Sequence, residues 1–215
     1  MSGESATASL LMLVTMGAFH GINPGMGWLF AVALGMQERR RGAVLRALVP
    51  LGAGHALAVA GAVLAAAAMG GVVPTPALRW AIAGILITLG VVRLFRHGHP
   101  RWVGMRVGAG RLTLWSFLMA TAHGAGLMVV PVFVGMSLAG GGAHAHHGAA
   151  SANTTASAAL VATGVHALSY LAVTAFVAVL VFERLGVGML RRAWFNLDLV
   201  WAIALAASGV ATLMM

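Results

Sequence analysis

The sequence contains no cysteine, no lysine and few acidic residues. Without cysteine there are no disulfides, no thiolate metal ligands and no cysteine nucleophile. None of the acids lies in the middle of an apolar stretch, which excludes a buried carboxylate pair or a Ser-His-Asp triad. A phosphate-binding Gly-Lys-Ser/Thr motif is also missing, so we expect no ATP hydrolysis and no enzymatic activity. The four acids are Glu4, Glu38, Glu183 and Asp198.

Apolar residues dominate instead. Of the 215 residues, 60% are hydrophobic and 8% are charged, whereas roughly a quarter of the residues of a soluble domain carry charge. One helical crossing of a bilayer needs roughly 20 apolar residues. The sequence therefore predicts an all-α integral membrane protein with six transmembrane helices and no soluble domain. The predicted runs are about 7–36, 47–70, 77–95, 112–139, 156–182 and 194–214.

Arginine supplies all 13 basic residues and the formal charge of +9. Twelve of them follow the first, third and fifth apolar runs, and only Arg79 lies on the other side. An excess of basic residues marks cytoplasmic loops, so we expect both termini to be extracytoplasmic, in a bacterial inner (plasma) membrane. The charge then indicates anionic lipid headgroups as partners, and not nucleic acid.

Histidine motifs recur at matching places in the two halves, 1–111 and 112–215. His-Gly occurs in the first and fourth runs, at His20 and His123, and His-Ala-Leu occurs in the second and fifth, at His55 and His166. Each half has three runs, so the second half is predicted to be inverted relative to the first. Secondary transporters built this way bind their substrate near the midplane, where the two repeats meet.

The same four histidines are the main candidates for a site. An ionisable side chain inside a membrane points into the bundle or a wet cavity and needs a partner, and no carboxylate is there to serve. The alternatives are four separately satisfied histidines or one shared site. We favour the shared site, because imidazole is the commonest metal ligand and suits nickel, copper and zinc. Alternatively, two facing imidazoles are suitable axial ligands for haem iron.

The segment after His20 contains the clearest local feature. Pro24 cannot donate to the His20 carbonyl, and three glycines surround it, so we expect the first helix to break near Pro24. Asn23 and Met26 then lie beside His20 and add an amide oxygen and a thioether to the candidate metal ligands. The other interpretation is a glycine-rich packing notch. Pro131 is expected to have a similar effect in the fourth run.

The His20 segment resembles the first signature of the nickel/cobalt transporter superfamily (NicO-like, LysE-type permeases), in which His is followed by acids at plus three and plus five and by His at plus six. In this chain those three positions hold Asn23, Gly25 and Met26. The second signature is similar to Gly54–His55–Ala56–Leu57, and the resemblance covers about two of the six runs. It implies a polytopic metal permease whose selective residues lie in the early helices.

A histidine-rich loop is predicted over residues 140–153, on the extracytoplasmic side. His144, His146 and His147 lie there in a Gly/Ala tract, a composition typical of metal binding and also of a linker with no further role. We interpret the loop as a possible metal-capture segment.

Three functions follow from these features. The first is a permease for a transition-metal cation (nickel or cobalt, with copper or zinc as alternatives), lined by His20, Asn23, Met26, His55, His123 and His166. The second is a bis-histidine haem protein that transfers electrons. The third is a non-catalytic accessory subunit.

Overall fold

The computed structural model describes residues 3–70, 75–95, 108–140, 149–185 and 197–214, and every regular element within them is a helix. The all-α prediction is confirmed for these residues. The elements, in order, are α1 (Gly3–Ile22), the 3-10 turn η1 (Pro24–Met26), α2 (Trp28–Glu38), α3 (Arg41–Gly70), α4 (Thr75–Phe95), α5 (Ala109–Ala122), α6 (Ala125–Gly140), α7 (Ala149–Leu180), the π-helical turn η2 (Val181–Leu185) and α8 (Leu197–Met214).

Two of the apolar runs are broken helices. The first run divides into α1 and α2 around η1, so the break expected near Pro24 is confirmed. The fourth run divides at His123 and Gly124, where α5 and α6 meet at a bend of 64°. The break expected at Pro131 is wrong, because Pro131 lies inside α6. Gly124, with φ +69°, adopts the left-handed backbone that glycine accepts most readily, and it ends α5 there.

Some predicted loops are shorter than expected. Only two residues separate α2 from α3, and the first of them, Arg39, has φ +52°. α3 therefore begins at Arg41, before the predicted start at residue 47. α7 begins at Ala149, inside the range 140–153 that was predicted as a loop.

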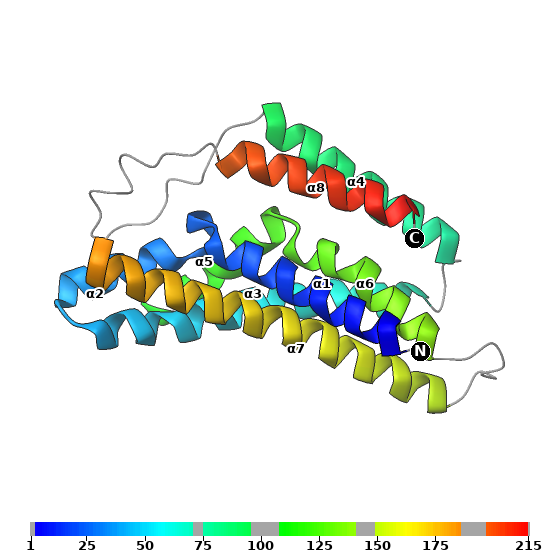
Figure 1. The fold of residues 1–215 in the computed structure, drawn as a ribbon, viewed down its shortest axis with the longest axis horizontal. Coiled ribbons are helices and arrows are strands. Elements are labelled where there is room, and N and C mark those ends of the chain that lie inside the picture. The colour runs from blue at the N-terminus through cyan, green and yellow to red at the C-terminus, as the bar shows by residue number, and fades with distance from the viewer. Residues whose placement is uncertain (1–2, 71–74, 96–107, 141–148, 186–196, 215) are drawn as a thin grey trace.

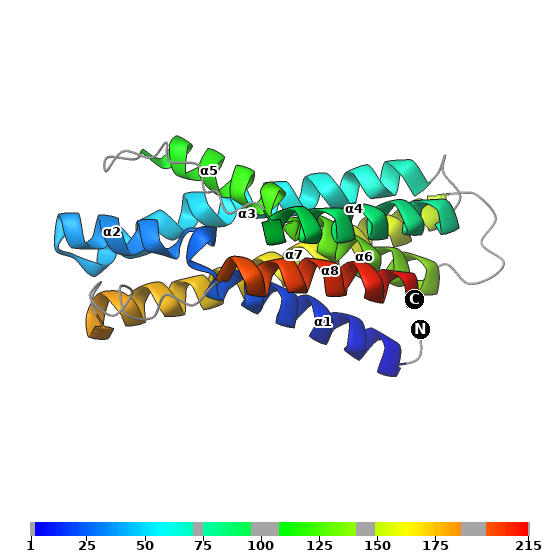
Figure 2. The same cartoon turned by 90° about the horizontal axis from the view of Figure 1, so that it is seen from above.

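The two halves have the same order of elements: a broken helix, a long helix and a shorter helix. Figures 1 and 2 show that α1 and α5 run in opposite directions along the long axis, as do α3 and α7 and also α4 and α8. α1 begins and α8 ends at one end of the bundle (Figure 1). The α2–α3 junction, the start of α5 and the end of α7 lie at the opposite end. The segments at that second end contain six arginines, whereas Arg79 belongs to the first turns of α4; the six are Arg39, Arg40, Arg41, Arg46, Arg111 and Arg184.

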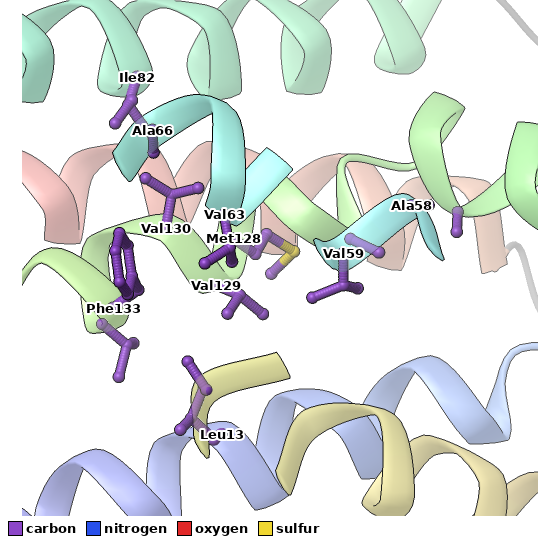
Figure 3. Close-up of a cluster of buried hydrophobic side chains, with 14 of the residues drawn as sticks. Leu13, Ala58, Val59, Val63, Ala66, Ile82, Met128, Val129, Val130 and Phe133 are labelled. Carbon is purple, nitrogen blue, oxygen red and sulfur yellow. The ribbon is translucent and has the colours of Figure 1, made fainter. Parts of the chain in front are cut away.

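Helices from different halves pack together: α1 against α7, α3 against α5, and α4 against α8. Glycine permits the first two contacts. A Cβ on Gly17 would collide with the carbonyl oxygen of His166, and a Cβ on Gly54 would collide with that of Thr113. The backbones therefore approach each other directly, beside two of the candidate histidines. Small residues have this role in membrane helix packing. Figure 3 shows part of the adjoining apolar core, which α3 and α6 supply together with Leu13 of α1 and Ile82 of α4.

Among the described residues, two stretches are long and apolar enough to cross a bilayer: Arg41–Met69 in α3, and Thr154–Arg184 in α7 and η2. The bent pair α5–α6 qualifies as a third crossing if it counts as one span. α1, α4 and α8 contain shorter apolar stretches. The structure thus contains two or three candidate spans, and six crossings remain a prediction.

Candidate functional site

Three of the four predicted histidines meet in the centre of the bundle. The ring centroid of His20, from α1, lies 5.6 Å from that of His55 (α3) and 5.0 Å from that of His166 (α7). The centroids of His55 and His166 are 5.4 Å apart, with their planes nearly parallel. All three side chains are fully buried. Residues 35 or more positions apart in the chain thus form one cluster, called here the histidine triad.

The hydrogen bond of His20 defines which of its ring nitrogens carries the proton. Nδ1 lies 2.7 Å from the Met16 carbonyl oxygen, one turn earlier in α1. A carbonyl only accepts hydrogen bonds, so Nδ1 carries the proton and the lone pair of a neutral ring is on Nε2. A backbone carbonyl that holds the second nitrogen is the usual support of a metal-bound imidazole.

His55 and His166 each have two ring nitrogens without a hydrogen-bond partner among the described residues. Both side chains are 0% exposed. Leaving a buried polar atom unsatisfied costs about 1–3 kcal/mol. This cost falls at the point where the three rings meet.

A tyrosine that sequence reasoning missed completes the cluster. Tyr170, the only tyrosine of the chain, is fully buried, and its ring stacks on His55 with centroids 3.7 Å apart. Its hydroxyl donates to the Met26 carbonyl oxygen, 2.7 Å away. Tyr170 follows His166 by one turn of α7, so both point the same way. The spacing of His166 and Tyr170 was the only sequence signal for this contact. It could not be interpreted without knowing that α3 and η1 pack against the same face of α7.

The break in the first run leaves backbone carbonyls without helical partners, and other groups satisfy them. The Asn23 N–H donates to the His20 carbonyl (3.2 Å), and the Trp28 indole donates to that of Ile22 (2.9 Å). Tyr170 donates to Met26 as described above. Irregular backbone inside a membrane protein is tolerated only where it is buried or lines a cavity. These bonds therefore hold η1 in place beside the triad.

The other predicted ligands have different surroundings. Asn23 is buried, and its side-chain oxygen accepts from the Gly25 N–H at 2.9 Å, so it caps η1. Met26 is 2% exposed. His123 is also buried, and its Nδ1 lies 2.8 Å from the Met119 carbonyl at the break between α5 and α6, the same arrangement that His20 makes with Met16. His144, His146 and His147 lie outside the described residues.

The spacing of the triad matches that of imidazoles around one small cation. A nitrogen about 2.0–2.1 Å from a metal places the ring centroid about 3.2 Å from it, and two rings at a tetrahedral angle are then about 5.2 Å apart. The observed separations are 5.0, 5.4 and 5.6 Å. As the rings stand, no group of three or more His or acidic side chains in the described part of the chain is arranged to hold a metal ion. A metal ion would bind all three rings only after they rotate about their side-chain bonds.

Ion pairs join the helix ends at the arginine-rich end of the bundle. Glu38 contacts Arg40 at 2.9 Å and Arg46 at 2.6 Å. The hydrogen bond from Arg40, with a smaller contribution from Arg46, lowers the pKa of Glu38. Arg41, at the start of α3, contacts Glu183 of η2 at 3.2 Å. All these groups are exposed, so each pair contributes little to stability.

No family model matches the chain, and neither the curated proteins nor the solved structures include one with significant similarity to it.

Proposed function

We propose that the protein is a membrane permease for a transition-metal cation, with the histidine triad as the intramembrane site. The observation that carries the proposal is the meeting of three buried imidazoles at centroid separations of 5.0–5.6 Å. His55 adds two ring nitrogens without partners in the described structure. Neutral imidazole binds nickel, cobalt, copper and zinc alike, so the triad supports this class of substrate. The resemblance of the His20 and His55 segments to nickel/cobalt transporters favours the same class.

The arrangement of the halves supports a transporter in particular. The two broken helices run in opposite directions, and each packs against the long helix of the other half. We interpret this as an inverted repeat of six crossings, with the triad near the interface between the repeats, where secondary transporters hold their substrates. The arginine-rich end then faces the cytoplasm, and both termini face away from it. The cytoplasmic arginines would contact anionic headgroups.

The haem alternative has less support. Two imidazoles on opposite sides of one iron have centroids about 6 Å apart, with the macrocycle between them. In the triad the rings are closer than this, and Tyr170 covers the face of His55. No observation favours an accessory subunit.

Flux through reconstituted vesicles tests the proposal. Proteoliposomes containing a metal-sensitive dye are exposed to nickel, cobalt, zinc, or copper with a reductant, and His55→Ala is compared with the wild type. His99→Ala, in the arginine-rich segment after the third run, is the matched control. We expect flux of at least one cation, its loss in His55→Ala and its retention in His99→Ala. Wild-type vesicles that pass none of these cations, or equal flux through a folded His55→Ala variant, would contradict the proposal.

A further inference from the structure

Among the described residues, the buried donor atoms around the histidine triad carry no negative charge. The buried polar side chains of the described residues are histidine, asparagine, serine and threonine, without an acid among them. The described carboxylates Glu4, Glu38 and Glu183 are exposed. Within the described part of the chain, a cation at the triad therefore meets neutral ligands only. The lack of charged ligands indicates which cation the site binds. This inference rests on the proposed permease function.

The charge of the ion strongly affects the cost of binding it at a buried site whose ligands are neutral. The cost of moving an ion from water into a low-dielectric interior rises with the square of its charge, and for one unit charge it is already several kcal/mol after relaxation. A divalent ion bound by neutral ligands keeps both charges uncompensated, whereas a monovalent ion keeps one. The absence of carboxylates from the buried set thus favours a monovalent cation.

Two buried methionines lie at the turn η1, beside the tyrosine that stacks on His55. Met26 lies in η1 itself, and its carbonyl is bonded to the tyrosine that stacks on His55. Met119, from α5, approaches from the other half: its terminal methyl lies 3.7 Å from the position that a Cβ on Gly25 would take. Both side chains are at most 3% exposed and belong to one buried cluster with Tyr170.

Thioether and imidazole together are a soft to borderline donor set. Thioethers select copper(I) among the biological metals, while hard cations prefer carboxylate and carbonyl oxygen. Nickel and zinc bind imidazole well, but gain little from a thioether and carry the second charge. We propose that the substrate of this site is a soft monovalent cation of the copper(I) class, bound by the histidine triad with Met26 and Met119.

Silver(I) is a suitable probe, because it is soft and monovalent and needs no reductant. Purified protein in chloride-free detergent buffer is dialysed against silver(I), zinc(II) or nickel(II), and bound metal is measured by mass spectrometry. A background with His144, His146 and His147 replaced by Ala removes binding by the loop. We expect one silver ion to bind with higher affinity than zinc or nickel, and His55→Ala to abolish that binding.

The methionines are tested by Met26→Leu and Met119→Leu in the same background, with Met36→Leu as control, since Met36 is exposed at 44%. Leucine keeps the volume of methionine and removes the sulfur, and such exchanges usually cost under about 1.5 kcal/mol of stability. We expect each buried variant to weaken silver binding roughly tenfold or more, as loss of an outer-sphere partner alone does. Zinc binding and the control should be unaffected.

Two failures are distinguishable. If zinc or nickel binds more tightly than silver in a His55-dependent manner, or if both leucine variants bind silver as the wild type does, this inference is wrong and the proposed permease stands. If none of the three cations binds in a His55-dependent manner, this inference and the intramembrane metal site are both wrong.

Discussion

Tyr170→Phe isolates one hydrogen bond at the centre of the molecule. The change removes the hydroxyl that donates to the Met26 carbonyl at 2.7 Å and keeps the ring that stacks on His55. Met26 ends η1, so its carbonyl lacks a partner within that turn. An unsatisfied buried acceptor costs about 1–3 kcal/mol. For a chain of this size that is a fall in the unfolding midpoint of roughly 2–12 °C.

The assay is thermal unfolding in detergent, followed by intrinsic tryptophan fluorescence. Ser169→Ala is the matched control: its hydroxyl also donates to a backbone carbonyl, that of Val14 at 2.7 Å, but the bond is exposed and Val14 lies within α1. We expect a change of less than about 0.5 kcal/mol there. Tyr170→Leu removes the stacked ring as well and should weaken metal binding more than Tyr170→Phe does. If Tyr170→Phe is as stable as the wild type, the hydroxyl does not hold the break in place.

Further predictions concern packing, capping and pH. Gly17→Ala should separate α1 from α7, because the added Cβ meets the His166 carbonyl; we expect a loss of about 1–3 kcal/mol and weaker metal binding, whereas Gly135→Ala, where a Cβ meets nothing within 4 Å, should change neither. Asn23→Ala should lose the cap of η1 and about 0.5–2 kcal/mol of stability, and Asn23→Asp should retain most of it; equal midpoints for the two variants would contradict the capping role. The lowered pKa of Glu38 means that its carboxylate stabilises the folded state above the ordinary value of 4.5, and that this contribution is lost as the pH falls through the lowered pKa. The stability difference between wild type and Glu38→Gln should therefore shrink on acidification below about 4.5, and a difference independent of pH would refute the assignment.

Local chemistry explains which parts of the fold were predictable. Pro24 lacks an N–H and has glycines on both sides, so the broken first helix follows from the sequence alone. The break at Gly124 was missed because a His-Gly pair inside an apolar run has no distinctive local signal. The break in this run was instead predicted at Pro131. Pro131 is accommodated within α6, as proline often is when neighbouring helices satisfy the freed backbone.

The histidines of the candidate site were predictable from the sequence, but the residues that surround and support them were not. The scarcity of acids left histidine as the main titratable residue inside the bundle, and three of the four predicted histidines meet. Tyr170 and Met119 were missed because their roles depend on which helices cross next to them. The crossings in turn depend on backbone contacts such as that of Gly17 with His166, which no local motif encodes.

X-ray absorption of the copper(I)-loaded protein tests the central claim, a cation held by the histidine triad, most directly. Imidazole ligands give a recognisable outer-shell scattering pattern at the copper edge. The claim predicts imidazole scattering in the wild type that disappears when His20, His55 and His166 are replaced together, while the loop histidines are already absent. A copper spectrum without imidazole, or one that this replacement leaves unchanged, would contradict it.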